Sequence, residues 1–97
     1  MVKHIVFWQL KEEEAPRAAA IAGDLRARFQ ALLGVVEGLE AIELGENYNN
    51  GPYQLALYCA FSSRQAEQAY QTHPAHLAIK QIVHALVCGR AAVDYEV

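Results

Sequence analysis

The residues best suited to chemistry lie in one short segment, Tyr70 to His76, which reads Tyr-Gln-Thr-His-Pro-Ala-His. Pro74 is typical of the first turn of an α-helix, where the backbone N–H that proline lacks would have no partner. His76 is then a first-turn residue, and the positive end of the helix dipole favours its neutral imidazole. A neutral imidazole near the phenol of Tyr70 is a plausible pair for proton transfer near neutral pH.

A third candidate, His4, lies in an apolar strand with the parity of Val2, Val6 and Trp8. In the predicted helix after Pro74, residues three and four apart form one stripe: His76, Ile79, Lys80, Val83 and Leu86. Because the apolar members of this stripe must face the sheet, His76 is expected to point inward. If His4 faces the same layer, it converges with Tyr70 and His76 in a largely aliphatic space, as in many small-molecule sites.

Each candidate also has a structural explanation. A lone histidine on an apolar face is more often a hydrogen-bonded core residue than a catalyst. A buried tyrosine often extends its hydroxyl to the surface. His73, just before the proline, is expected to cap the helix, and His84 is expected to be solvated. The combination of His4, Tyr70 and His76 therefore carries the functional hypothesis.

Other chemistries find little support in the sequence. His4, His73 and His76 make a poor metal set, because nothing supplies a fourth ligand. The chain has no Gly-rich phosphate loop, Ser–His–Asp set or H-E-x-x-H motif. Cys59 and Cys88 lack C-x-x-C spacing, and both are expected to be small buried hydrophobes in strands. We predict neither a metal nor a cofactor.

The composition limits the class of protein. With 97 residues the chain is expected to form a single domain over residues 1–97. Its net charge of -3 and its scattered Lys and Arg residues argue against nucleic-acid binding. The apolar run from Ile5 to Trp8 is too short for a signal peptide or a membrane span. We therefore expect a soluble, cytoplasmic protein.

The elements that must position these residues follow a recognisable order. The pattern predicts four strands, at Val2–Leu10, Leu39–Glu46, Tyr53–Phe61 and Ala91–Val97, the last with Val87 as an alternative start. A helix from Ala15 to Leu33 follows the first strand. A short helix to about Tyr70 and a helix from Pro74 to about Leu86 lie between the third strand and the last. Gly34 and Gly38 bracket the exit of the first helix. This order is the split βαβ, ferredoxin-like arrangement, an α+β fold whose four-stranded antiparallel sheet carries helices on one face.

The first and third predicted strands are apolar on both faces, although helices cover only one face. Hydrophobic residues make up 54% of the chain and charged residues only 20%, which leaves surplus apolar surface on a small domain. A second copy of the chain, packed sheet against sheet, would cover it. We predict a homodimer of the dimeric α/β-barrel type.

These residues resemble the stress-responsive dimeric α/β-barrel family, often called Dabb proteins. The resemblance covers nearly the whole chain, and its most specific part is the Tyr-x-x-His-Pro-x-His run. The other matching parts are Val2-Lys3-His4-Ile5-Val6, Gly45, Tyr53 to Phe61, and Val93-Asp94-Tyr95. The resemblance implies the ferredoxin-like fold and the homodimer, but less about function, because many bacterial members have no assigned activity.

One plant branch of this family cyclises linear polyketides by aldol condensation. The resemblance implies an acid/base role for His76, with Tyr70 beside it and His4 as a further pocket histidine. That branch has another pocket histidine where this chain has Leu55, which argues against the same substrate. Some plant relatives also bind Mg²⁺ through backbone carbonyls after the first helix. The matching positions are roughly Leu33, Val36 and Leu39, but Gly34 and Gly38 alter the segment, so no ion is expected here.

Three functional hypotheses follow. In the first, the protein is a cofactor-independent cyclase, lyase or isomerase that binds a small organic molecule. His76 removes a proton next to a carbonyl, Tyr70 polarises the carbonyl oxygen and His4 orients the substrate. In the second, it is a non-catalytic, stress-associated homodimer in which His4 and His76 only satisfy each other or the backbone. The third, a cofactor-free monooxygenase acting on a quinol-like compound, rests on fold analogy alone.

Overall fold

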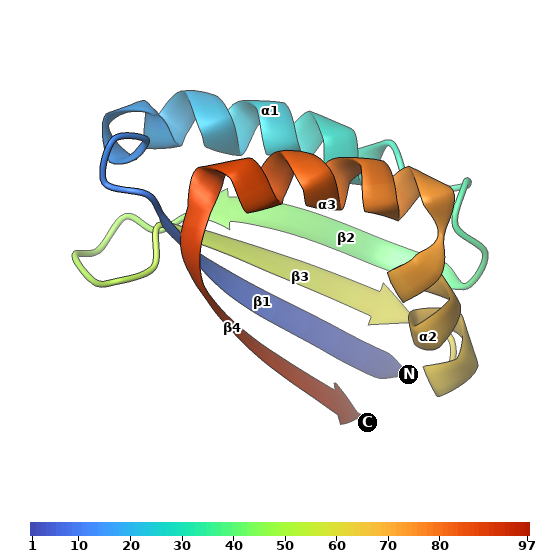
Figure 1. Cartoon of the computed structure of the whole chain (residues 1–97). Coiled ribbons are helices and arrows are strands. Elements are labelled where there is room, and N and C mark those ends of the chain that lie inside the picture. The colour runs from blue at the N-terminus through green and yellow to red at the C-terminus, as the bar shows by residue number, and fades with distance from the viewer.

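The computed structural model describes residues 1–97 (Figure 1). Its elements are β1 (Val2–Leu10), a 3₁₀ turn η1 (Ala15–Arg17), α1 (Ala18–Gln30), β2 (Leu39–Glu46), β3 (Leu55–Phe61), α2 (Arg64–Thr72), α3 (Pro74–Leu86) and β4 (Val87–Glu96). The strands form one sheet in the order β2-β3-β1-β4, and every neighbouring pair is antiparallel. The fold is therefore the ferredoxin-like α+β arrangement that the sequence predicts. No helix in the structure has both the length and the apolar character needed to span a membrane.

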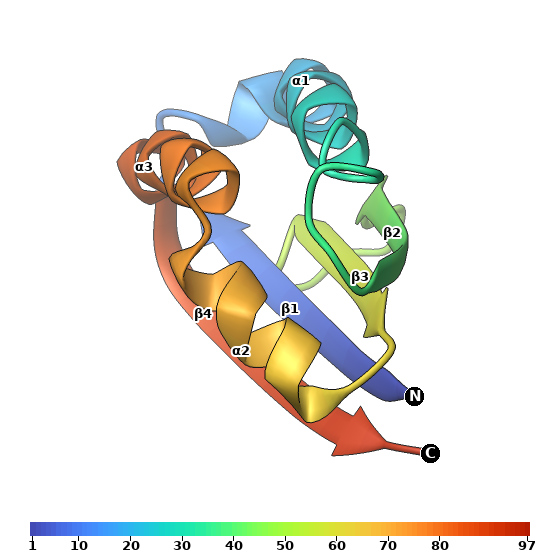
Figure 2. The same ribbon diagram turned by 90° about the vertical axis from the view of Figure 1, so that its right-hand side faces the viewer.

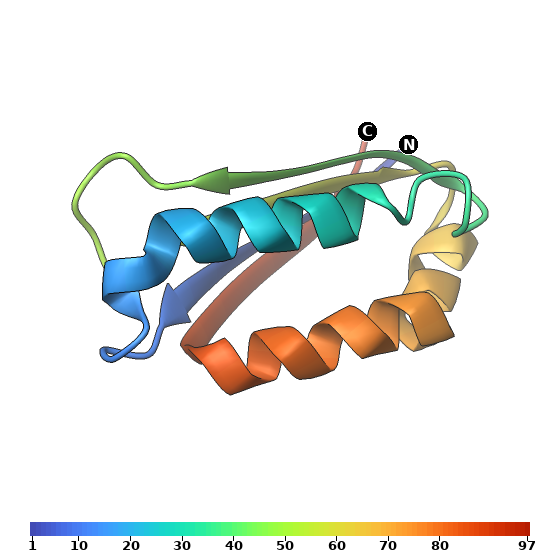
Figure 3. The ribbon, with the colours of Figure 1, turned by 90° about the horizontal axis from the view of Figure 1, so that it is seen from above.

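The helices lie on one face of the sheet. α1 and α3 lie next to each other over this face, as Figure 3 shows from above, and α2 covers the end of the sheet near the two termini (Figure 2). The core between the layers contains fully buried side chains from both: Leu25, Phe29, Leu55, Leu57 and Phe61. This packing buries the apolar stripe of each helix, which is the main source of its stability.

The register of β1 explains where His4 lies. Side chains of a strand alternate between faces, and the even-numbered residues of β1 all face the helices and are buried: Val2, His4, Val6, Trp8 and Leu10. His4 lies opposite Cys59 of β3 and Asp94 of β4. The alternation therefore places one imidazole inside an otherwise apolar layer.

The other face of the sheet carries no helix. Its exposed apolar side chains include Phe7, Val93 and Tyr95, which are 39%, 58% and 45% exposed. The ring of Phe7 lies 5.9 Å from that of Tyr53. Within the chain, this outer face of the sheet remains open to solvent.

Two glycines shape the connection from α1 to β2. Gly34 and Gly38 have φ values of +82° and +83°, in the left-handed region that side chains disfavour. At Gly38 a side chain would also overlap the Cβ atom of Ala66 in α2. Glycine at this position therefore allows α2 to approach the chain closely.

Several boundaries differ from the predictions. α1 ends at Gln30, because tighter turns follow, in which Leu33 N–H donates to the Gln30 carbonyl. β3 begins at Leu55, because the Gln54 side chain turns to accept a hydrogen bond from the Leu10 N–H. The short helix α2 continues to Thr72, and β4 begins at Val87, the alternative start predicted from the sequence, directly after α3.

The prediction for the cysteines is half wrong. Cys59, in the central part of the sheet, is fully buried, whereas Cys88 is exposed. Cys88 lies at the start of β4, an edge strand with no neighbour on its outer side. An edge strand buries its side chains less than a central strand does, and every residue of β4 keeps some exposure.

Candidate functional site

A cavity of about 250 Å³ lies between the helices and the sheet, where β1 contributes most of the sheet residues that line it. Its apolar wall is formed by Val6, Trp8, Phe29, Leu57 and Val83. The polar side chains that line it are His4, Tyr70, Gln71, His76, Lys80, His84 and Arg90. The cavity is slightly smaller than the range of about 300–1,000 Å³ found for drug-sized ligands, so it suits a small molecule.

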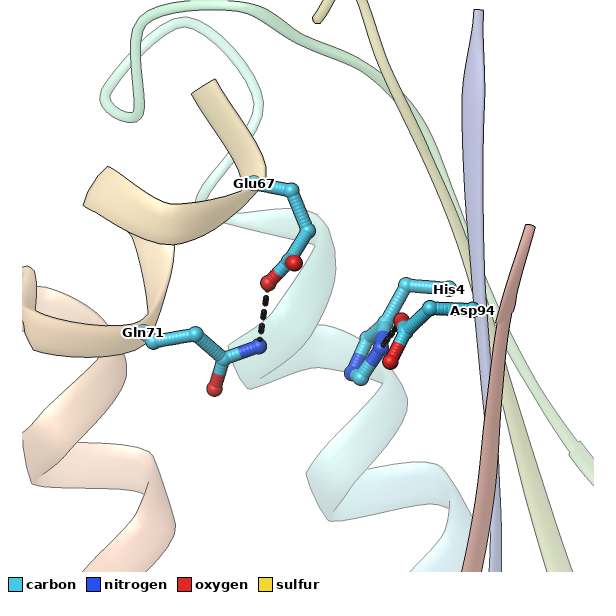
Figure 4. A network of polar contacts seen from close by, with 4 residues as sticks. All are labelled: His4, Glu67, Gln71 and Asp94. Atoms are coloured by element: carbon cyan, nitrogen blue, oxygen red, sulfur yellow. Dashed lines mark hydrogen bonds and ion pairs between the residues drawn. The ribbon is translucent and has the colours of Figure 1, made fainter. Parts of the chain in front are cut away.

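His4 is held by a carboxylate. Its Nδ1 atom pairs with Oδ1 of Asp94 across the β1–β4 ladder (Figure 4). The His4 side chain is only 5% exposed, whereas that of Asp94 is 50% exposed. A carboxylate that accepts the Nδ1 proton fixes the tautomer and leaves Nε2 as a proton acceptor. The pair thus has the arrangement of a general base and the group that orients it.

His76 lies where the sequence predicts, facing inward from the first turn of α3. Pro74 occupies the start of the helix, and His73 caps it by accepting a hydrogen bond from the Ala75 N–H. His76 is 8% exposed, and its Nδ1 atom is buried without a well-formed hydrogen bond, although the backbone of Tyr70 and Gln71 lies close to the ring. Burial lowers the pKa of His76, and the nearby charge of Lys80 acts in the same direction. The imidazole is therefore neutral near neutral pH, mainly through burial rather than through the helix dipole.

Tyr70, in the last turns of α2, is fully buried. Its ring stacks on His76 with centroids 4.0 Å apart, and it meets the ring of His4 edge-on at 6.2 Å. Its hydroxyl is buried and makes no well-formed hydrogen bond, although the Cys59 thiol, a weak partner, lies beside it. Burial raises the pKa of Tyr70, and the neighbouring Cys59 thiol adds to the effect. The phenol therefore keeps its proton and can act as a hydrogen-bond donor.

The structure thus brings together the three residues predicted from the sequence: His4, Tyr70 and His76. Among the other candidates, His73 is the helix cap that the sequence predicts. His84 is exposed, as predicted, yet it also lines the cavity. From β3, Leu57 rather than Leu55 lines the cavity. No three His, Cys, Asp or Glu side chains are grouped so that they could hold a metal ion.

Sequence reasoning did not assign several residues of the site. Asp94 is the most important, and the expected pairing of the first and last strands could have indicated it. Gln71 also lines the cavity, and its amide donates to Oε2 of Glu67 at 2.7 Å (Figure 4). Lys80 and Arg90 line the cavity too. Arg90 lies opposite Trp8 in the β1–β4 register, which only a known strand pairing reveals.

Fold and cavity together define a small ferredoxin-like domain with a candidate ligand site between sheet and helices. The chain belongs to the stress responsive A/B barrel domain family (Dabb), which it matches over residues 2–97. No curated protein matches the chain.

Solved structures with the same fold are similar over nearly the whole chain. A dimeric protein of unknown function with a ferredoxin-like fold from Bacteroides fragilis is 32% identical, with 99% of this chain and 95% of that chain covered and a TM-score of 0.88. A hydroxynitrile lyase from Passiflora edulis is 15% identical over 99% and 92% of the two chains, with a TM-score of 0.79. A putative antibiotic biosynthesis monooxygenase from Nitrosomonas europaea is 18% identical over 100% and 98%, with a TM-score of 0.74. The last two likenesses show the fold alone.

Proposed function

We propose that this Dabb domain binds a small carbonyl compound in the cavity and moves a proton to or from the carbon next to the carbonyl, without a cofactor. The observation that carries the proposal is a pair of buried polar atoms that make no well-formed hydrogen bond within the chain, the Tyr70 hydroxyl and His76 Nδ1. An unsatisfied buried polar group costs about 1–3 kcal/mol, so such groups are rarely retained without a role. A carbonyl compound bound in the cavity offers the hydroxyl a partner.

In the proposed reaction, the carbon–hydrogen bond next to the carbonyl breaks and the proton passes to His76. The electron pair of that bond moves to the carbonyl oxygen, which becomes an enolate. The Tyr70 hydroxyl, kept protonated by its raised pKa, donates a hydrogen bond to that oxygen. The enolate then takes back a proton at carbon, as in an isomerase, or attacks a second carbonyl carbon, as in a cyclase. His4, oriented by Asp94, holds the substrate.

The alternative of a non-catalytic homodimer requires His4 and His76 to satisfy each other or the backbone. His4 pairs instead with Asp94, and neither Nδ1 of His76 nor the Tyr70 hydroxyl makes a well-formed hydrogen bond within the chain, although the Tyr70 and Gln71 backbone and the Cys59 thiol lie close to them. These contacts favour a ligand-binding site. The monooxygenase hypothesis has no comparable support, because the likeness to the Nitrosomonas protein concerns the fold.

A hydrogen–deuterium exchange experiment tests the proposed reaction. Phenylacetone carries exchangeable protons next to its carbonyl, and proton NMR in deuterium oxide follows their loss. We expect the protein to accelerate this exchange, and His76→Gln to lower the rate by about 10²–10⁴-fold, as for the loss of a general base. Gln81→Ala, at an exposed position of α3 outside the cavity lining, serves as the control and should retain the rate. Exchange that is not accelerated, or that His76→Gln leaves unchanged, would contradict the proposal.

We further propose that the single domain, residues 1–97, acts in the cytoplasm as a homodimer joined through the outer face of the sheet. The exposed apolar side chains of that face support this assembly, since monomers rarely expose contiguous apolar patches. The Bacteroides relative is described as dimeric. Sedimentation equilibrium should give twice the chain mass, and Phe7→Glu should shift it to the chain mass. Leu77→Glu, on α3, is the control that should leave the mass unchanged.

A further inference from the structure

Two cationic side chains of the cavity have no partner within the chain. Lys80 of α3 and Arg90 of β4 line it from the helix side and the sheet side. Neither takes part in any ion pair or side-chain hydrogen bond in the structure. Three other arginines each pair with a carboxylate of the chain: Arg17 with Glu14, Arg28 with Asp24 and Arg64 with Glu96. The cavity thus holds cations that the chain does not neutralise.

The charged side chains that line the cavity have the opposite sign to the net charge of the whole chain. The chain contains 11 acidic and 8 basic residues and has a net charge of -3. The cavity lining nevertheless contains no Asp or Glu, but Lys80, Arg90 and three histidines. Two carboxylates lie next to the cavity without lining it, and both are hydrogen-bonded: Asp94 pairs with His4 and Glu67 accepts from Gln71. A cleft lined by one sign of charge attracts ligands of the other sign.

We infer that the cavity takes an organic anion, whose carboxylate pairs with Lys80 and Arg90 while its carbonyl lies near Tyr70 and His76. This inference rests on the proposed function and names its substrate class, a small oxo acid with an apolar body. Arginine suits the task, because its guanidinium can bind both oxygens of a carboxylate.

The spacing of the residues fits such a ligand. Lys80 follows His76 by four residues on α3, which corresponds to a rise of about 6 Å along the helix. Arg90 enters from the opposite side, because it lies beside Trp8 in the β1–β4 ladder. A carboxylate a few atoms from the reacting carbon can therefore reach the cations. The apolar wall of Trp8, Phe29 and Val83 is then left for the rest of the molecule.

The electrostatic coupling within the site agrees with this geometry. The charge of Lys80 acts to lower the pKa of His76, although burial is the larger cause. The charge of Arg90 acts to lower the pKa of Tyr70, against the larger raising effects of burial, Cys59 and Glu67. Both cations are therefore close enough to stabilise the negative charge that develops on the carbonyl oxygen of the ligand in the proposed reaction.

Two probes that differ only in the anionic group test the inference. Phenylpyruvate carries a carboxylate where phenylacetone has a methyl group, and calorimetric titration measures the affinity of each. At low salt we expect phenylpyruvate to bind about tenfold more tightly, which corresponds to about 1.4 kcal/mol. The advantage should shrink as salt is added. The double variant Lys80→Met/Arg90→Met should lose it and keep its affinity for phenylacetone, whereas Lys11→Met should bind both probes like the original chain.

The outcomes separate this inference from the proposed function. Equal affinity for the two probes, or an affinity for phenylpyruvate that the double variant retains, would overturn the inference and leave the proposed function standing. Binding of neither probe, together with no acceleration of phenylacetone exchange, would overturn both. Thermal unfolding of the double variant checks that it is folded. We expect it to fold, because both substituted side chains are exposed.

Discussion

Removing the Tyr70 hydroxyl is expected to stabilise the ligand-free protein. The hydroxyl is buried with only the weak Cys59 thiol beside it and makes no well-formed hydrogen bond, so Tyr70→Phe deletes a poorly satisfied polar group and keeps the aromatic packing on His76 and Phe61. The cost of such a group is about 1–3 kcal/mol, and the small void that phenylalanine leaves offsets part of it. We expect the free energy of unfolding to rise by about 1 kcal/mol. For a domain of this size, that raises the melting temperature by about 4–8 °C.

The same change is expected to impair function, because phenylalanine cannot donate a hydrogen bond to a developing enolate. Urea unfolding and phenylacetone exchange, measured on the same preparation, test the two effects together. Tyr58→Phe is the matched control: the Tyr58 hydroxyl accepts a hydrogen bond from Lys3, so its removal should lower stability by about 0.5–1.5 kcal/mol. Tyr70→Phe that destabilises the protein by as much as Tyr58→Phe would refute the reasoning, since it would mean that the Tyr70 hydroxyl has a partner in solution.

Three further changes test other parts of the structure. In urea unfolding, Gly38→Ala should destabilise the protein by about 1–3 kcal/mol more than Gly34→Ala, because both glycines have positive φ but only Gly38 adjoins Ala66. An equal loss of stability in the two variants would contradict the close approach of α2. Burial lowers the pKa of His76 in the folded protein, so this histidine takes up a proton at a higher pH in the unfolded chain than in the folded one. The free energy of unfolding should therefore decrease as the pH falls below about 6.5, the ordinary pKa of histidine. His76→Gln should weaken that drop, and an identical pH profile would speak against the buried imidazole. Burial raises the pKa of the Cys59 thiol to about 12, so an aromatic disulfide reagent should modify only the exposed Cys88 as long as the chain is folded. Rapid modification of both thiols would contradict the burial of Cys59.

The regular elements could be predicted from the sequence where side-chain periodicity and end signals agreed. β1, β2 and α3 have the predicted bounds, the last because Pro74 marks its start. The failures lie where tertiary contacts determine the ends. Gln54 belongs to a strand pattern, but its side chain binds the backbone of β1 and so delays β3. No local pattern contains that contact.

The candidate site was predictable in part for a similar reason. Strand parity and helix spacing place His4 and His76 on inward faces, because both depend on local geometry. The partner of His4 depends instead on the register between β1 and β4, and this partner, Asp94, is 90 positions away in the chain. Arg90 was missed on the same grounds. The exposure of Cys88 required the strand order, which puts β4 at the edge of the sheet.

Successive side chains of β4 face opposite sides of the sheet, so the same strand contributes to the candidate site and to the proposed dimer interface. Asp94 faces the helices and orients His4, whereas its neighbours Val93 and Tyr95 face outward, where a second copy would pack. An edge strand is hydrogen-bonded to only one neighbouring strand, so it frays more readily than a central strand does. Subunit association would hold this strand against β1 and keep the imidazole oriented. Dilution that separates the subunits should therefore lower the turnover per chain, while the fold itself persists.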